Sequence, residues 1–141
     1  MIEETAATQV GVSGVRDAVT VRLPASSVYL SVLRTTTAGL AARLDFTLDE
    51  IEDLRIAVDE ACSMLLGQAA PDSQLECGFE LLADAMRVCV TVPTADGREP
   101  AHDTFAWTVL NALAGSVDSG VDDDGRVSLV LYKRRDTVGS R

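Results

Sequence analysis

The chain has 141 residues, which fits one domain that buries its own hydrophobic core without disulfides or metal ions. Hydrophobic residues make up 47% of the chain and the mean hydropathy is +0.15, which excludes a disordered protein. The sequence has no long apolar run and no signal peptide, which predicts a cytoplasmic protein without membrane contact. The formal net charge of −10 argues against direct nucleic-acid binding, because phosphate contacts need clustered lysine and arginine.

The first part of the chain predicts a leader, a strand and a helix. Residues 1–17 mix small, polar and charged types, so we interpret them as a flexible leader. Residues 18–24 alternate apolar and polar side chains as a strand does, and Pro24 ends that strand. Residues 26–44 then predict a helix that begins at a serine cap and carries a stripe of core leucines.

Residues 48–70 give the strongest helix signal in the chain. Thr47 is the expected N-cap, and Glu50 completes a capping box. Apolar residues recur at three- and four-residue steps, and Pro71 closes the segment. Glu60 lies off the apolar face, where a carboxylate could act as a general base. Charged positions on helices are more often solvated faces, so both interpretations stay open.

The second half predicts a β-hairpin, a helix and a final strand. Residues 74–82 and 86–92 have the composition of paired strands, with a short turn between them. An aromatic-rich helix follows, which residues 115–118 end, and residues 127–132 form a continuous apolar strand. The elements together predict an α/β fold of two layers, a mixed β-sheet with helices on one face.

No linker or internal repeat interrupts the chain, so we expect residues 18–135 to form a single domain and residues 136–141 a tail. The cysteine count is 3, without a Cys-x-x-Cys pair, which indicates neither a disulfide framework nor a zinc site. The single histidine has no partner at metal-ligand spacing. We therefore expect reduced, packed thiols and no metal.

Residues 51–63, Ile-Glu-Asp-Leu-Arg-Ile-Ala-Val-Asp-Glu-Ala-Cys-Ser, resemble the N-box helix of the anti-sigma serine-protein kinases. That family belongs to the GHKL (Bergerat-fold) ATPase superfamily and inhibits alternative sigma subunits of bacterial RNA polymerase. Residues 24–46 resemble the family's first helix, and nearly the whole chain can be laid on the pattern. The resemblance implies a two-layer GHKL sandwich and a homodimer that forms through the sheet.

The N-box positions are only partly kept. The family's catalytic glutamate falls on Glu60, and its magnesium-binding asparagine falls on Met64. Mg²⁺ is a hard cation that takes oxygen ligands, whereas a thioether is soft. The resemblance therefore implies that the N-box helix is present but lacks the metal ligand of the family, so that Glu60 is a vestigial base.

The glycine-rich nucleotide elements of the family are also incomplete. Asp96 and Gly97 match the start of its adenine-binding Asp-x-Gly-x-Gly loop if an insertion is allowed, whereas the ungapped register puts the adenine aspartate on Thr94. An Asp-Gly pair by itself predicts a turn. The family's lid ends in Gly-x-Gly-Leu, but this chain has no glycine between Gly97 and Gly115. The aromatic-rich helix there is either a plug of the nucleotide site or plain core.

Arg34 is the candidate for partner binding. In ungapped register it falls on the family arginine that contacts both the sigma subunit and the antagonist protein. A lone surface arginine ordinarily has no such role, so this assignment comes from the resemblance alone.

Three functions are compatible with these residues. The first is an anti-sigma factor without kinase activity, which sequesters a stress or development sigma subunit until a STAS-domain anti-anti-sigma antagonist releases it. The second is an active serine-protein kinase that uses Mg-ATP, with Glu60 as base and Asp96 as adenine ligand, and phosphorylates its STAS antagonist. The third is a partner-switching adaptor without a sigma target. The degenerate nucleotide elements favour binding over catalysis and predict that no cofactor is needed.

Overall fold

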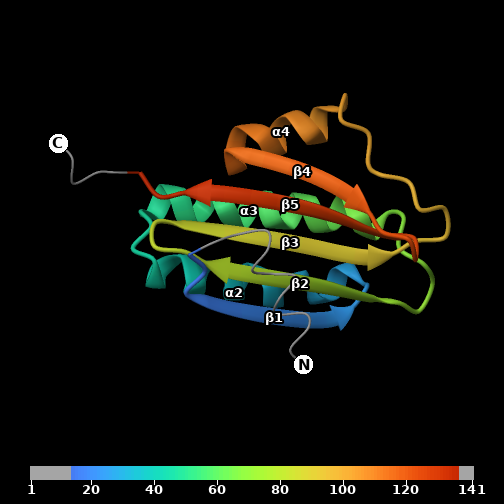
Figure 1. Ribbon diagram of the computed structural model, residues 1–141, viewed down its shortest axis with the longest axis horizontal. Coiled ribbons are helices and arrows are strands. Elements are labelled where there is room, and N and C mark those ends of the chain that lie inside the picture. Colours follow the sequence, from blue (N-terminus) through green and yellow to red (C-terminus); the bar gives the residue numbers. More distant parts are fainter. Residues whose placement is uncertain (1–13, 137–141) are drawn as a thin grey trace.

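Helices stack against one face of an antiparallel β-sheet in the computed structural model, which describes residues 14–136 (Figure 1). Residues 1–13 of the predicted leader and residues 137–141 of the predicted tail lie outside the described residues. The elements in chain order are β1 (Asp17–Pro24), the 3₁₀ turn η1 (Ser27–Tyr29), α2 (Leu30–Arg43), α3 (Leu48–Leu66), β2 (Gln74–Leu81), β3 (Ala85–Pro93), α4 (Phe105–Ala114), β4 (Ser116–Val121) and β5 (Arg126–Arg134).

The strands lie in the order β1-β2-β3-β5-β4, and every pairing among the described residues is antiparallel. The predicted mixed sheet is therefore wrong, and the cause is β4, whose first residues we interpreted as the end of a helix. Gly120 and the polar side chains of this strand weaken its sequence signal, which an edge strand tolerates. The turn at residues 122–125 folds β4 back onto β5, so this pair is also antiparallel.

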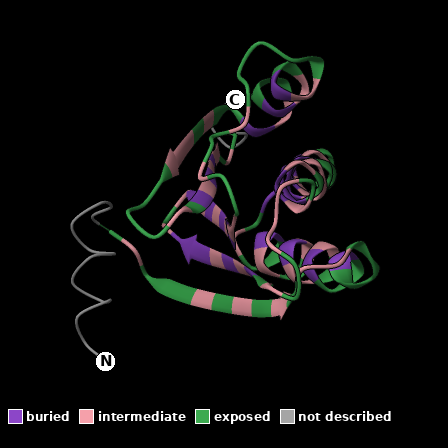
Figure 2. Ribbon diagram, turned by 90° about the vertical axis from the view of Figure 1, so that its right-hand side faces the viewer, coloured by how far each residue is buried: buried purple, intermediate pink, exposed green. Residues whose placement is uncertain are grey.

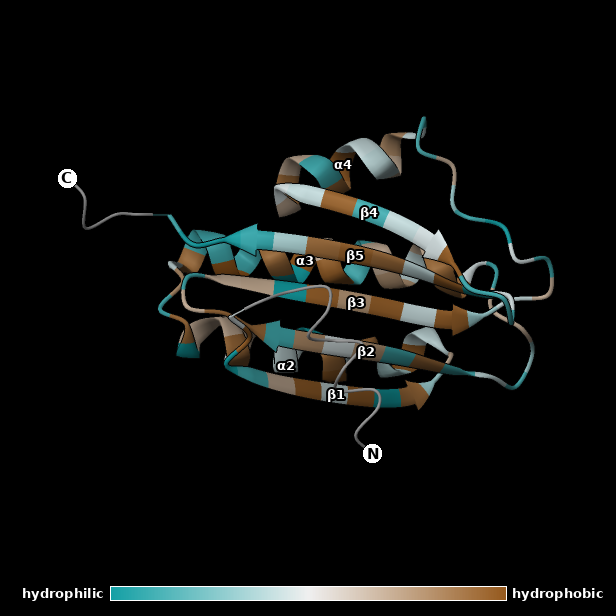
Figure 3. Ribbon diagram, in the orientation of Figure 1, coloured by the Kyte–Doolittle hydropathy of each residue, from teal (hydrophilic) through white to brown (hydrophobic). Residues whose placement is uncertain are grey.

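The core lies between the sheet and the three helices α2, α3 and α4 of the described chain. Strand residues alternate between buried and more exposed positions, and the buried ones face the helices (Figure 2). Figure 3 shows β5 apolar through its middle and hydrophilic towards its arrowhead. α3 occupies the centre of the layer, between α2 and α4 and across β3 and β5. The predicted two-layer α/β architecture is confirmed.

Local signals set the position of α3. The Thr47 hydroxyl accepts a hydrogen bond from the Glu50 N–H at 3.1 Å, and Oε1 of Glu50 accepts one from the Thr47 N–H at 2.7 Å. This is the predicted capping box. The second oxygen of Glu50 accepts a hydrogen bond from the Asp136 N–H at 2.6 Å. The cap therefore also fastens the residues after β5 to the start of α3.

Replacing Glu50 with glutamine is expected to lower the free energy of unfolding at neutral pH by about 1–3 kcal/mol, because buried N–H groups lose a charged acceptor. Burial raises the pKa of Glu50, but hydrogen bonds from Thr47 and Asp136 outweigh it and leave the pKa below its usual value. A lowered folded-state pKa gives stability that is present above the unfolded-state pKa of about 4.3 and is lost as the pH falls through the folded-state value.

Urea unfolding of the wild type and the Glu50→Gln variant at neutral and acidic pH measures this effect. We expect the difference between the two proteins to be full at neutral pH and to shrink in acid. A difference that stays constant with pH would contradict the assigned charge of Glu50.

Candidate functional site

Two carboxylates of α3, Asp53 and Asp59, contact different neighbouring elements. Oδ1 of Asp59 accepts a hydrogen bond from Nη1 of Arg34 on α2 at 2.6 Å. Asp53 lies on the other flank, with its Oδ2 at 4.0 Å from Nζ of Lys133 on β5. Glu60 is half-buried and belongs to the flank of Asp53, two helical turns further on. Helical spacing therefore puts the predicted base Glu60 on the Asp53 side of α3, whereas Arg34 contacts α3 from the side of α2.

The flank that holds Glu60 lies beside α4, because Nζ of Lys133 also donates to the carbonyl oxygen of Leu113 at 3.0 Å. Met64, one turn after Glu60, is partly buried and packs against the hydrophobic core. Within residues 14–136, no group of three or more His, Cys, Asp or Glu side chains is arranged to hold a metal ion. The packed thioether of Met64 supplies no oxygen ligand of the kind that Mg²⁺ prefers.

Asp96 and Gly97 form a turn whose hydrogen bonds stay within residues 94–98 and the turn between β4 and β5. Oδ1 of Asp96, which is exposed, accepts from the Arg98 N–H at 3.2 Å. Gly97 has φ +62°, a conformation that favours glycine, and its N–H donates to the Thr94 hydroxyl at 2.7 Å. That hydroxyl donates in turn to the carbonyl of Gly125 at 2.8 Å, in the turn between β4 and β5.

The connection that follows, where the resemblance places the kinase lid, is fastened to the elements around it. Nε2 of Gln68, just after α3, donates to the carbonyl of Arg98 at 2.6 Å. The Ser119 hydroxyl on β4 donates to Glu99 at 2.5 Å and lies 2.9 Å from Nε2 of His102. Contacts from Gln68 and from β4 therefore hold the segment at several points along its length.

His102 stacks on the indole of Trp107, with ring centroids 3.7 Å apart and planes at 10°. Trp107 is buried against the core, while Phe105 at the start of α4 is 83% exposed. The Thr104 hydroxyl accepts from the Trp107 N–H at 3.2 Å and caps α4. α4 is thus a core helix, with Trp107, Leu110 and Ala114 buried. The His102–Trp107 stack was not predicted from the sequence, because it depends on the path of the loop.

Replacing His102 with alanine is expected to expose one face of the Trp107 indole and to shift its emission to longer wavelength, because water then replaces the stacked ring. Trp107 is the single tryptophan of the chain, so the emission reports on this contact alone. Ser119→Ala is the matched control, since it removes the hydroxyl that His102 contacts and keeps the ring. Equal spectra for the wild type and His102→Ala would contradict the stacked arrangement.

The 3₁₀ turn η1 and the start of α2 carry exposed apolar side chains. Val28, Tyr29 and Val32 are 73%, 41% and 42% exposed. Arg34 lies at the seam with α3, and its side chain is 42% exposed. Small residues one helical turn away, Ser31 among them, leave its guanidinium open to a partner. Apolar area beside an accessible arginine is the composition of protein–protein contacts.

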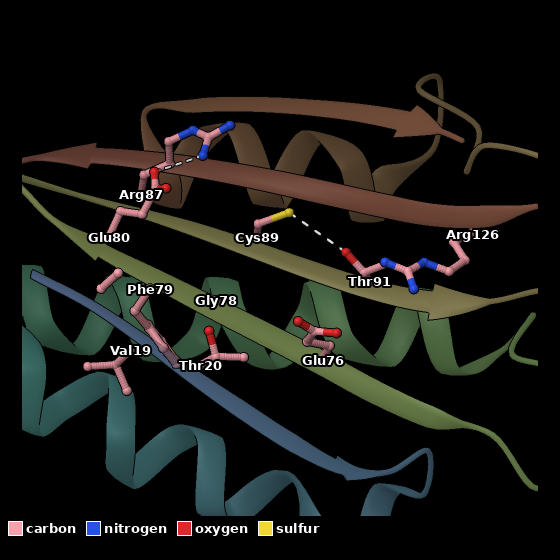
Figure 4. A pocket seen from close by; sticks show the side chains of 11 residues that line it. Val19, Thr20, Glu76, Gly78, Phe79, Glu80, Arg87, Cys89, Thr91 and Arg126 are labelled. Atoms are coloured by element: carbon pink, nitrogen blue, oxygen red, sulfur yellow. Dashed lines mark hydrogen bonds and ion pairs between the residues drawn. The ribbon is translucent and has the colours of Figure 1, made fainter. Parts of the chain in front are cut away.

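The face of the sheet away from the helices is polar. Residues of β1, β2 and β3 line a hollow of about 330 Å³ on this face. Figure 4 shows their side chains, and Glu60 is not among the lining residues. Oε1 of Glu80 accepts from Nη1 of Arg87 at 2.8 Å, and the two residues are directly opposite on β2 and β3. Arg22 pairs with Glu76 at 3.6 Å. Most of the charges on this face are therefore already paired within the chain.

The cysteines are packed thiols, as predicted. Cys62 and Cys77 are buried and Cys89 is half-buried, and all are free. Burial, and next the charge of Asp59, raise the pKa of Cys62 to about 12. The pKa of Cys77 is also raised by burial. Neither of the two buried thiols is suited to act as a nucleophile. No helix within residues 14–136 is long and apolar enough to cross a membrane.

The chain is similar to several curated proteins, although no family model matches it. It is 29% identical to the serine-protein kinase RsbW of Halalkalibacterium halodurans, over 84% of this chain and 85% of that protein. It is 32% identical to the serine-protein kinase RsbW of Bacillus pumilus, over 74% of this chain and 69% of that protein. It is 34% identical to the anti-sigma-F factor RsbW of Mycobacterium tuberculosis, over 75% of this chain but only 62% of that protein.

A solved structure shares the fold. A crystal structure of the RsbU and RsbW domains from Mycobacterium tuberculosis matches with a TM-score of 0.65 at 16% identity. The match covers 84% of this chain and 32% of the larger protein. At this identity the likeness concerns the arrangement of helices and strands.

Proposed function

This chain belongs to the RsbW family of serine-protein kinases and anti-sigma factors, and from that premise we propose that it is an anti-sigma factor which works by binding alone. It sequesters an alternative sigma subunit of bacterial RNA polymerase, of the stress or development type, and a STAS-domain anti-anti-sigma protein releases that subunit. Such a protein acts in the cytoplasm, where RNA polymerase is. We take residues 18–135 as the single domain that performs this function.

One observation carries the proposal, the difference between the two flanks of α3. The flank towards α2 keeps Arg34 accessible at the seam of the helices. The flank towards α4 has Met64 packed against the core in place of an oxygen ligand. The side that suits a partner is intact, and the side that would suit a magnesium nucleotide lacks its ligand. This contrast supports binding without phosphoryl transfer.

The loop after β3 supports the same proposal. A kinase of this family needs a lid that moves over its nucleotide. Here Arg98 is hydrogen-bonded to Gln68, which follows α3, and His102 contacts Ser119 on β4. The Asp96–Gly97 turn directs its hydrogen bonds inward. We infer that Asp96 and Gly97 shape the loop and do not bind adenine. We also infer that no nucleotide cofactor is required.

The open face of the sheet is the proposed site of a homodimer. Its paired charges, Glu80 with Arg87 and Arg22 with Glu76, lie around small residues such as Gly78. A second copy can approach such a face closely without leaving a charge unpaired. Sedimentation of the purified chain tests this proposal, and a monomer at micromolar concentration would reject it.

The alternative is an active serine-protein kinase. It is favoured by the names of the Halalkalibacterium halodurans and Bacillus pumilus relatives, and by Glu60, which is half-buried at the position of the family's base. Incubation with Mg-ATP and a STAS protein, followed by intact-mass measurement, separates the two functions. A phosphate added to the STAS protein would reject the binding-only proposal.

A tagged pull-down from the native cytoplasm, performed with and without Mg-ATP, tests the proposed function. We expect a sigma subunit in equal amount under both conditions. Recovery of STAS proteins without any sigma subunit would favour the adaptor and overturn the anti-sigma proposal.

A further inference from the structure

The ion pair between Arg34 and Asp59 joins two helices from positions far apart in the sequence. Nη1 of Arg34 and Oδ1 of Asp59 are 2.6 Å apart, which is a short, charge-assisted hydrogen bond. The side chains are 42% and 37% exposed, so the pair sits at the surface where a partner can reach it. A guanidinium has five N–H donors, and those that Asp59 does not use remain available to a partner.

An unrestrained arginine at this place would sample many rotamers, and ordering it on binding costs affinity. Asp59 removes much of that cost before the partner arrives, because it holds the guanidinium against α3. The backbone of α3 is itself fixed, since Ala57, Val58 and Ala61 are fully buried around this position. Asp59 therefore holds the arginine against a helix whose neighbouring residues are packed in the core.

We propose that Asp59 is a positioning residue which presets Arg34 for partner binding, so that this surface is ready without any nucleotide. The inference rests on the proposed partner role of Arg34. It assigns to α3 a second task besides packing, that of holding a contact residue of its neighbour in one geometry.

Loss of the Asp59 charge has two opposing effects on binding. It frees the Arg34 side chain, which weakens the complex, and it unmasks a positive charge, which would strengthen a complex with an acidic group. The net charge of −10 speeds encounter with a basic partner but does not determine which acceptor meets Arg34, and for an uncharged carbonyl acceptor the unmasked charge adds little. The ordering effect therefore dominates, and Asp59→Asn weakens binding.

The test is a double-mutant cycle with the sigma subunit recovered in the pull-down. Asp59→Asn is expected to raise the dissociation constant by about twofold to tenfold, the range for losing one preordered side chain. In an Arg34→Ala background it should have no further effect. Glu52→Gln is the matched control, because it removes one carboxylate of the same helix from another ion pair, with Arg55 at 3.3 Å.

The double variant Arg34→Asp/Asp59→Arg separates positioning from stability. It keeps an ion pair between the helices, so its unfolding midpoint should stay near that of the wild type, while partner binding falls to the level of Arg34→Ala. An equal loss from Asp59→Asn with and without Arg34, or an equal loss from Glu52→Gln, would overturn the positioning role.

A measurement on the free protein needs no partner. Nitrogen relaxation of the Arg34 Nε–H should show an ordered side chain in the wild type and a mobile one in Asp59→Asn. Equal mobility in the two proteins would overturn the inference even if the anti-sigma function holds. Failure of the wild type to bind any sigma subunit would instead reject the proposed function and leave the ordering of Arg34 to be decided by this experiment.

Discussion

Replacing Arg34 with alanine is expected to weaken binding of the sigma subunit by about 30-fold, the effect of losing a contact residue worth about 2 kcal/mol. The side chain is accessible at the seam of α2 and α3, and no other described arginine combines this place with a fixing carboxylate on α3. Its loss also leaves Asp59 without its partner at the interface, and burying an unpaired carboxylate on binding costs affinity.

Titration calorimetry with the purified sigma subunit measures this effect. Arg43→Ala is the matched control, because it removes the same charge from the exposed end of the same helix. We expect this control to bind within about twofold of the wild type, as rim charges contribute little. Equal affinities for the wild type and Arg34→Ala would remove Arg34 from the partner-binding surface.

Replacing Leu54 with alanine is expected to lower the free energy of unfolding by about 2–5 kcal/mol, the range for deleting a fully buried leucine side chain. Leu54 has no exposed surface and lies on the central helix α3, so the neighbouring elements cannot close the cavity without moving α2 or α4. A loss of this size is a large part of the stability of a small domain.

Urea unfolding followed by circular dichroism measures this loss. Leu48→Ala is the matched control, since Leu48 begins the same helix and is 84% exposed. We expect the control to change the stability by less than about 0.5 kcal/mol. Similar losses for the two variants would contradict the central position of α3 in the core.

The sequence predicted best those elements that local chemistry determines. α3 begins at the predicted residue because Thr47 and Glu50 form a capping box that acts within one helical turn. Its predicted end at residue 70 was too late, since the helix stops at Leu66 and the following residues form turns before Pro71. A proline sets the last position that a helix can reach, but the helix can end several residues earlier.

β4 was not predicted, because its stability comes from pairing with β5. The residues Ser116–Val121 contain a glycine and few apolar side chains, and they form a strand because the acidic turn returns the chain along an apolar strand, β5. The antiparallel pairing of β5 with β3 depended on this missed strand, which reverses the chain between α4 and β5. A sequence pattern reports the face that a strand buries, and an edge strand buries little.

The candidate site divides in the same way. The sequence alone predicted that Glu60 and Met64 lie one turn apart on one helix, and that the glycine lid is missing. The sequence did not predict the pairing of Arg34 with Asp59 or the stacking of His102 on Trp107, because each contact joins residues that only the fold brings together. A lone histidine and a lone arginine carry no signal of their partners.

The most direct test of the central claim compares the dissociation constant of the complex between this chain and its sigma subunit in the presence and absence of Mg-ATP. Titration calorimetry on the purified proteins gives both values. A binding-only anti-sigma factor predicts values that agree within about twofold. A complex that forms only with Mg-ATP would contradict the account, because it would require a working nucleotide site beside Met64.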